Sequence, residues 1–146
     1  MEENLALLRH VPLFSGLNEA RLRPLANSAR ICAFPKDAAI VEQGQRTEEA
    51  QDGDSLYVIV DGHVRVVRDR AGQEEQLNRL GPGDFFGEMA LLDGKPRSAT
   101  VISEEEIQCL VLSRWDLLRA MRRDPEIAIQ MLTEMSGRLR GMIEAD

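Results

Sequence analysis

The spacing of hydrophobic residues changes twice along the chain. Apolar residues recur at helical spacing up to residue 29, alternate with polar residues in short runs from residue 30 to residue 112, and return to helical spacing after residue 113. We therefore predict a single domain over residues 1–146, with N-terminal helices at 1–29, a β-barrel at 30–112 and C-terminal helices at 113–146.

The N-terminal helical pattern consists of two pieces. Leu5 and Leu8 mark a first short helix. Pro12 breaks the pattern, and a second helix begins near Asn18. Phe14 is an apolar residue in the turn between the two helices, so we expect it to dock onto another part of the molecule.

Between residues 30 and 112 the pattern has the period of two that half-buried strands show. The alternating runs lie at residues 31–34, 39–41, 55–60, 64–67, 75–80, 98–103 and 107–112. Asp61-Gly62 between two of these runs predicts a β-hairpin, and the segment Gly81–Asp84 predicts a turn. Roughly eight short strands at regular spacing predict a closed or sandwiched antiparallel β architecture.

After the strands, the helical pattern consists of two segments, and Pro125 begins the second of them. Ser113 and Asp124 are predicted to cap helices that begin at Arg114 and at Pro125. The last helix carries a heptad stripe of Ala128, Leu132, Met135, Leu139 and Met142, and its apolar face is widened by Ile127, Met131 and Ile143. We predict that the stripe meets a second copy of the chain in a homodimer. The alternative is packing of this helix against the strands of its own chain.

Composition and charge narrow the class of protein. The 146 residues are 43% hydrophobic and 29% charged, which is typical of a globular domain, and the net charge of −7 argues against direct binding of nucleic acid. The N-terminus is acidic, and no apolar run is long enough to span a membrane. We therefore expect a cytoplasmic protein that has no membrane partner.

The two cysteines, Cys32 and Cys109, lie far apart in the sequence in apolar surroundings. Neither belongs to a CxxC motif, and no histidines cluster near them. We therefore predict buried free thiols, and neither a metal site nor a redox motif.

The stretch FFGEMALLDGKPRSATV, residues 85–101, carries the candidate chemistry. Gly87 precedes a short apolar run that ends at Gly94, which predicts about one helical turn whose first N–H groups can bind an anion. Arg97 can hold a phosphate through charge-assisted hydrogen bonds. Glu88 would repel a phosphate, so its partner is expected to be a neutral donor such as a sugar hydroxyl. Together these residues predict a site for a phosphorylated sugar.

The motif FGEMALL followed by PRSAT resembles the phosphate-binding cassette of cyclic-nucleotide-binding domains, as found in bacterial catabolite activator proteins, cyclic-nucleotide-gated channels and kinase regulatory subunits. The resemblance implies that Glu88 accepts a hydrogen bond from the ribose 2′-hydroxyl and that Arg97 binds the cyclic phosphate. The ligand-binding residues that it implies are Phe86, Gly87, Glu88, Met89, Ala90, Arg97, Ser98, Ala99, Thr100 and Leu77. The alternative is a vestigial pocket in which Glu88 and Arg97 only pair with each other.

The resemblance also implies a fold and a function. The fold is mainly β with flanking α: an antiparallel eight-stranded jelly-roll β-barrel, or double-stranded β-helix. The function is that of a sensor that binds a 3′,5′-cyclic nucleotide, cyclic AMP rather than cyclic GMP, and signals by helix rearrangement to an effector protein or a fused effector domain. No cofactor and no enzymatic activity are expected, because the site has no nucleophile–base pair, metal ligands or paired carboxylates. The alternative is a protein-interaction or dimerisation module with a vestigial pocket.

Several features are left open by the sequence. Ser98 fits bacterial family members that bind cyclic AMP, yet its hydroxyl also suits a guanine. Met135 and Arg138 are candidates for contact with the base from the last helix. The segment Gly44–Asp54 is longer than the turn that the family has there, and is either an exposed flexible loop or a loop that contacts a partner. The chain is either a whole protein or the regulatory part of a longer one.

Overall fold

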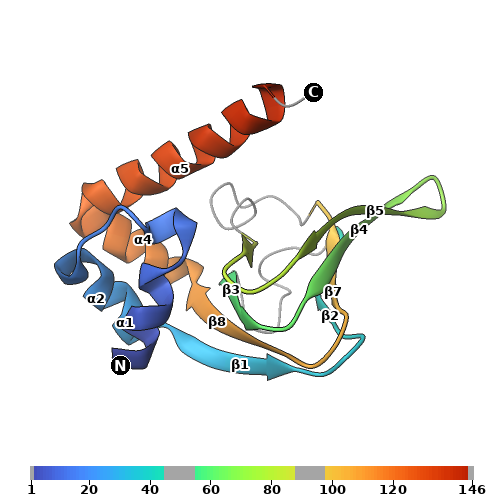
Figure 1. Cartoon of the computed structure of the whole chain (residues 1–146), viewed down its shortest axis with the longest axis horizontal. Helices are drawn as coiled ribbons and strands as arrows, with labels where there is room; N and C mark the ends of the chain where they lie inside the picture. Colours follow the sequence, from blue (N-terminus) through green and yellow to red (C-terminus); the bar gives the residue numbers. More distant parts are fainter. Residues whose placement is uncertain (1, 45–54, 88–97, 145–146) are drawn as a thin grey trace.

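Eight strands form the centre of the molecule in the computed structural model, which describes residues 2–44, 55–87 and 98–144. They make two antiparallel sheets of four strands (Figure 1). In the first sheet the order is β1 (Arg30–Phe34), β8 (Ile107–Ser113), β3 (Ser55–Asp61) and β6 (Phe85–Phe86). In the second sheet the order is β2 (Ala39–Val41), β7 (Thr100–Ser103), β4 (Val64–Arg70) and β5 (Gln73–Leu80).

The predicted fold class, mainly β in an antiparallel jelly-roll arrangement with flanking helices, is confirmed. Figure 1 shows the helices gathered at one end of the strands. The predicted closed barrel is corrected in one respect, because no pairing between described strands joins the two sheets into one cylinder.

The turn at Asp61-Gly62 does not form the β-hairpin that was predicted, because it joins β3 of the first sheet to β4 of the second. Gly62 has a φ of +94°, and a Cβ at this position would clash with the side chain of Ile107. The hairpin lies instead between β4 and β5, where Ala71 and Gly72 both have positive φ, as turns of type I′ require. Figure 1 shows this hairpin extending away from the helices.

Two strands differ from the predicted pattern. β7 begins at Thr100 rather than at Ser98, because Ser98 and Ala99 lie in a bend. The strand β6 was not predicted, since its two residues are too few to show an alternating pattern.

The helices begin and end near the predicted residues. They are α1 (Glu2–Arg9), the 3₁₀ turn η1 (Pro12–Phe14), α2 (Glu19–Ser28), α4 (Arg114–Arg123) and α5 (Pro125–Glu144). The predicted caps are present: the Ser113 hydroxyl accepts from the N–H of Asp116, and the Asp124 carboxylate accepts from the N–H of Glu126. Among the described residues, no helix is long and apolar enough to cross a membrane.

Buried apolar side chains form two clusters on opposite faces of the first sheet. The helix cluster joins all the helices above to the outer face of β3 and β8, and includes Leu8, Phe14, Leu22, Leu117 and Met131. The strand cluster lies between the two sheets and comprises Val41, Tyr57, Ile59, Val64, Phe86, Val101, Ile107, Cys109 and Val111. Phe14 is fully buried in the helix cluster, which confirms that the turn between the N-terminal helices docks onto the rest of the molecule.

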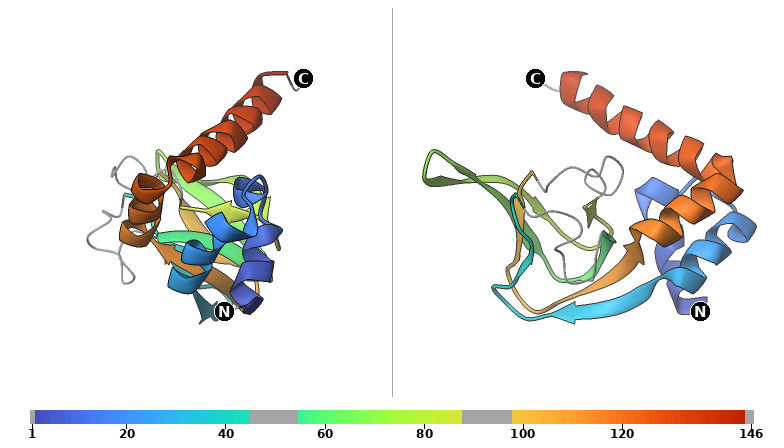
Figure 2. Two further views of the ribbon diagram at one scale, coloured as in Figure 1. Left: turned by 90° about the vertical axis from the view of Figure 1, so that its left-hand side faces the viewer. Right: turned by 180° about the vertical axis from the view of Figure 1, so that it is seen from behind.

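Helix α5 is buried only in its first half. Ile127 and Met131 are 1% and 2% exposed in the helix cluster, and the helix contacts η1. Of the heptad residues further along, Leu132, Leu139 and Met142 are 58–75% exposed, as is Ile143, whereas Met135 is half-buried against the helix cluster. Figures 1 and 2 agree that the C-terminal end of α5 stands away from both sheets.

The two cysteines fit their prediction only in part. Both thiols are free, and Cys109 is fully buried in β8. Cys32 is half-buried rather than buried, because β1 is the edge strand of its sheet.

Candidate functional site

The predicted cassette begins at β6, which is the second edge strand of the first sheet. Phe85 and Phe86 pair with Val58 and Tyr57 of β3. Successive residues of a strand point to opposite faces, so Phe85 lies in the helix cluster and Phe86 in the strand cluster. The entrance to the cassette therefore contacts both clusters.

Phe86 is held by aromatic packing. Its ring lies parallel to that of Tyr57, with centroids 4.9 Å apart and 6° between the ring planes. Tyr57 in turn meets Phe34 edge to face, with centroids 6.2 Å apart. Aromatic pairs of this kind contribute roughly 0.5–1.5 kcal/mol beyond the burial of their surface. Packing thus fixes the residue that precedes Gly87.

The turn that leads into β6 is bound to β3, and the turn predicted at Gly81–Asp84 is confirmed. The Ile59 N–H donates to the carbonyl of Asp84, and the Gly83 N–H donates to the carbonyl of Ile59, both at 2.8 Å. The Asp84 carboxylate accepts from the N–H of Gly81 at 2.9 Å. These bonds set the direction from which the chain enters the cassette.

Gly87 has a φ of +94°, a conformation that residues with a Cβ rarely adopt. It follows β6 directly, so it turns the chain at the point where the aromatic packing ends. The glycine predicted at the mouth of an anion site therefore stands where the backbone itself requires glycine.

The cassette ends on the second sheet. Ser98 is exposed, Ala99 is half-buried, and Thr100 begins β7, where it pairs with Val67 of β4. The N–H of Gln43 donates to the Thr100 hydroxyl at 2.9 Å. Because the hydroxyl accepts this bond, its own proton is left to donate. The two described ends of the cassette thus lie in different sheets.

Leu77 lies on β5, the edge strand of the second sheet. Its neighbours Gln76 and Asn78 pair with consecutive residues of β4, Val67 and Val66, so Leu77 is the extra residue of a β-bulge. Its side chain is 44% exposed. The structure therefore places Leu77 two strands from Thr100 in the same sheet.

Four members of the predicted ligand set lie outside the described residues: Glu88, Met89, Ala90 and Arg97. Their roles in ribose and phosphate binding, and the helical turn predicted there, stay predictions. The same holds for the predicted loop at 44–54, of which only Gly44 is described.

Arg138 is a residue of α5 that contacts the entrance of the cassette. Its guanidinium carbon lies 4.1 Å from the centroid of the Phe85 ring, which is a cation–π contact. Met135, the other residue predicted to touch the base, is half-buried against the helix cluster. Contact of either residue with a base stays a prediction.

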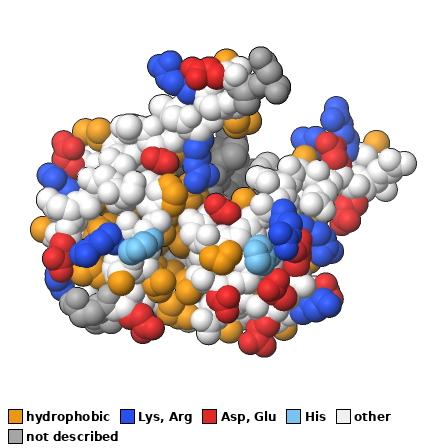
Figure 3. Space-filling model, in the orientation of Figure 1, with side chains coloured by type: hydrophobic (Ala, Val, Ile, Leu, Met, Phe, Trp, Pro, Cys, Tyr) orange, Lys and Arg blue, Asp and Glu red, His pale blue; other side chains and the backbone are white. Residues whose placement is uncertain are grey.

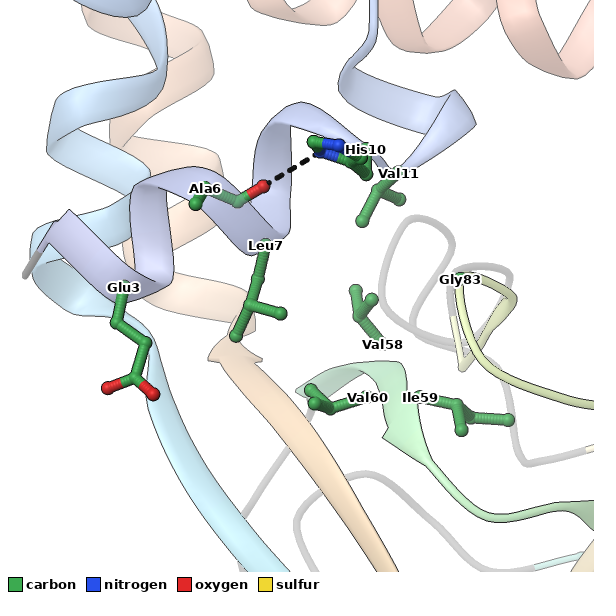
Figure 4. Close-up of a pocket in the computed structure, with 9 residues that line it drawn as sticks. All are labelled: Glu3, Ala6, Leu7, His10, Val11, Val58, Ile59, Val60 and Gly83. Carbon is green, nitrogen blue, oxygen red and sulfur yellow. Dashed lines mark hydrogen bonds between the residues drawn. The ribbon is translucent and has the colours of Figure 1, made fainter.

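A hollow of about 420 Å³ lies between α1 and β3 (Figure 4). Its lining is mostly apolar, with Leu7 and Val11 on the helix side and Val58 and Val60 on the strand side. The described residues that line it include no lysine or arginine and no member of the predicted ligand set. The described lining therefore offers a phosphate no lysine or arginine, and its one basic side chain is His10.

Charges of both signs are mixed on the face that Figure 3 shows. Over the second sheet, Arg68 pairs with Glu75 at 3.2 Å and Arg79 pairs with Glu104 at 2.8 Å. In the part of the chain that the structure describes, no three acidic, histidine or cysteine residues are grouped to hold a metal ion.

The role of Tyr57 in positioning the entrance was missed by sequence reasoning, although its strand was predicted. The alternation over residues 55–60 places Tyr57 on the same face as Ile59, so its burial was predictable. Its stacking on Phe86 was not, because that contact depends on the pairing of β3 with β6.

Comparison with known proteins gives the family. The family described as "Cyclic nucleotide-binding domain" matches residues 31–124, which include both sheets, the cassette and α4. The chain belongs to this family. The resemblance expected from FGEMALL and PRSAT is confirmed.

Three similar proteins show how far the match extends. The Cyclic AMP receptor protein of Thermus thermophilus is 37% identical over 136 residues, which cover 92% of this chain and 59% of that protein. The crystal structure of the Thermus thermophilus catabolite activator protein has a TM-score of 0.77 at 36% identity and covers 90% of this chain and 59% of that one. The co-crystal structure of the regulatory domain of Toxoplasma gondii PKA with cAMP has a TM-score of 0.72 at 28% identity, covering 82% and 43%. This chain spans about three fifths of the length of the curated receptor.

Proposed function

We propose that the chain is the sensor part of a regulator and binds 3′,5′-cyclic AMP in the cassette between β6 and β7. The observation that carries the proposal is the position of the motif. FGEMALL begins where Phe86 and Gly87 leave the first sheet, and PRSAT ends where Thr100 enters the second. Cyclic AMP is favoured over cyclic GMP because one similar protein is named as its receptor and another structure contains it.

The proposed roles follow from chemistry and from the described ends of the cassette. Arg97 would bind the cyclic phosphate, and Glu88 would accept from the ribose 2′-hydroxyl. Gly87 has no Cβ, so an anion can approach the backbone there. Ser98 is exposed and available to the phosphate, whereas Thr100 holds the far end of the cassette through its bond with Gln43.

Occupancy of the cassette is proposed to reach α5 through β6. Phe86 is the first residue of the cassette motif, and the guanidinium of Arg138 in α5 lies over the ring of its neighbour Phe85. A shift of the entrance would therefore change a contact of the last helix. A ligand moves the helix only if it binds the two arrangements with different affinity, and such coupling is typically about 1–3 kcal/mol.

Isothermal titration with cyclic AMP tests the site. We expect binding that Arg97→Ala weakens roughly 10- to 100-fold, because a hydrogen bond to a charged group contributes about 1.5–3 kcal/mol. Arg122→Ala removes an exposed arginine of α4 and is the matched control, which should bind as the unchanged chain does. Absence of binding heat for both cyclic AMP and cyclic GMP would overturn the proposal. Cyclic AMP recovered intact afterwards would support a sensor without enzymatic activity.

A second function, self-association, is favoured by the exposed apolar residues of α5. Leu132, Leu139 and Met142 are exposed residues at heptad positions of α5. The C-terminal end of this helix stands away from the sheets. We propose that they pair with a second copy of the chain. Sedimentation equilibrium should show a dimer that Leu139→Glu dissociates, while Thr133→Glu on another face of the helix leaves it intact. A monomer at every concentration tested would contradict the proposed dimer and favour packing of α5 within its own chain.

The effector is proposed to be a partner protein or a fused domain. The mass of the protein purified from its natural source separates these two cases. The cytoplasmic location stays a prediction.

A further inference from the structure

The fold brings the two cysteines of the chain together. In the ladder between β1 and β8, Cys32 is the direct partner of Cys109. Both side chains face the same side of the sheet, because Cys32 packs against the strand cluster, of which Cys109 is a member. Two residues that are far apart in the sequence thus become cross-strand neighbours.

The spacing of such neighbours suits a disulfide. Directly opposed residues of an antiparallel pair have Cα atoms about 4.5 or 5.5 Å apart, depending on whether they share hydrogen bonds. Disulfides join Cα atoms about 4.4–6.8 Å apart, so either type of pair is within range.

The two thiols differ in their access to solvent. Cys32 is half-buried on an edge strand, so a dissolved oxidant can reach it. Cys109 is fully buried on the neighbouring inner strand. The sulfur of Cys109 therefore meets Cys32 within the fold and is shielded from the sulfur of any other molecule.

We propose that Cys32 and Cys109 are a reversible oxidation site, at which a hydroperoxide joins β1 to β8 by an intramolecular disulfide. The Cys32 sulfur attacks the O–O bond of hydrogen peroxide, gains the oxygen as a sulfenic acid and releases water. The Cys109 sulfur then attacks the Cys32 sulfur; the S–O bond breaks, and the leaving hydroxide takes the Cys109 proton to form a second water. Two thiols lose two electrons in total, and one peroxide gains them.

The second step is expected to be the slower one. Burial, and to a smaller extent the neighbouring Cys32, raises the pKa of the Cys109 thiol to about 12. Below that pH the thiolate fraction of Cys109 rises about tenfold for each pH unit, so disulfide closure should accelerate as the pH rises. The sulfenic acid on Cys32 should accordingly last long enough to be trapped with dimedone at neutral pH.

The test is intact mass spectrometry of the native chain after treatment with hydrogen peroxide, followed by denaturation and alkylation with iodoacetamide. We expect the mass to fall by two hydrogens, neither cysteine to be alkylated, and a peptide map to contain the cross-link between Cys32 and Cys109. Dithiothreitol should restore both alkylations. Two alkylated cysteines after peroxide, or chains linked to one another with Cys109 still free, would overturn the proposal.

Single variants separate the two steps. In Cys109→Ser, the oxidation of Cys32 should stop at the sulfenic acid that dimedone traps. In Cys32→Ser, which changes a half-buried edge position and should fold normally, Cys109 should stay reduced and alkylatable after the same treatment. Oxidation of Cys109 in Cys32→Ser would show that peroxide reaches the buried thiol directly, against the proposal.

Discussion

Phe85 and Phe86 are neighbours in the chain, yet they belong to different parts of the molecule. Phe85 is 4% exposed in the helix cluster and lies under Arg138 of α5. Phe86 is 5% exposed in the strand cluster and stacks on Tyr57. The two side chains are equally buried, and only their surroundings differ.

This difference shows how a two-residue strand can serve as a junction. Packing on the Phe86 side fixes the start of the cassette relative to the sheets. The Phe85 side contacts helices that are held by side-chain packing, among them α5. In the proposed mechanism, a change in the cassette would be resisted on the Phe86 side and passed on to α5 on the Phe85 side.

The largest expected effect comes from removing either ring. Phe85→Ala and Phe86→Ala should each lower the free energy of unfolding by about 3–5 kcal/mol, because each leaves a cavity in a packed cluster. Urea denaturation measures the loss. Leu77→Ala, at a side chain that is 44% exposed, is the control and should cost much less. If only one of the two variants lost little free energy of unfolding, the cluster around that phenylalanine would not be what fixes β6 in place.

The helix side of the comparison depends on the anchoring of α5. Met131→Ala should lower the free energy of unfolding by about 2–5 kcal/mol, because Met131 is buried in the helix cluster. Its neighbour Leu132 is 63% exposed, so Leu132→Ala should leave the stability of the monomer nearly unchanged. Equal losses in the two variants, measured by urea denaturation at low protein concentration, would contradict the burial of one face only.

The contact between Arg138 and Phe85 should contribute about 0.5–1 kcal/mol, as cation–π pairs at exposed sites do. A double-mutant cycle of Arg138→Ala with Phe85→Leu should return a coupling energy of that size. The matched cycle with Phe86→Leu should return none, because Phe86 faces the other cluster. Similar coupling in both cycles would remove the distinction between the two rings.

The smallest effect is expected at the junction of α4 and α5. Arg21 and Asp124 form an ion pair at 2.8 Å, but their side chains are 39% and 31% exposed. Such pairs contribute about 0.2–1 kcal/mol and are screened by salt. Arg21→Ala should therefore cost less in concentrated salt than in dilute buffer. A loss that does not depend on salt would assign the role of Arg21 to packing instead.

Local signals were enough to predict the helices and their caps. Ser113 and Asp124 begin their helices by bonding N–H groups two or three residues away, so the information lies in adjacent residues. The resemblance to the family could likewise be predicted because the residues of the motif are contiguous, and the family match confirms that resemblance.

The pairing between strands that are distant in the sequence could not be predicted from such local signals. Asp61-Gly62 has the sequence of a hairpin, yet contact with Ile107 of β8 decides its conformation and its strands join different sheets. The same limit applies to the stack of Tyr57 on Phe86, and to Cys32 opposite Cys109. Each of these contacts is set by strand register, which a period of two leaves open.

The most direct test of the junction is hydrogen–deuterium exchange with and without saturating cyclic AMP. The account predicts slower amide exchange both in the peptide that contains Phe86 and Gly87 and in the part of α5 around Arg138. Protection of the first peptide with unchanged exchange along α5 would contradict transmission through Phe85, even if cyclic AMP binds.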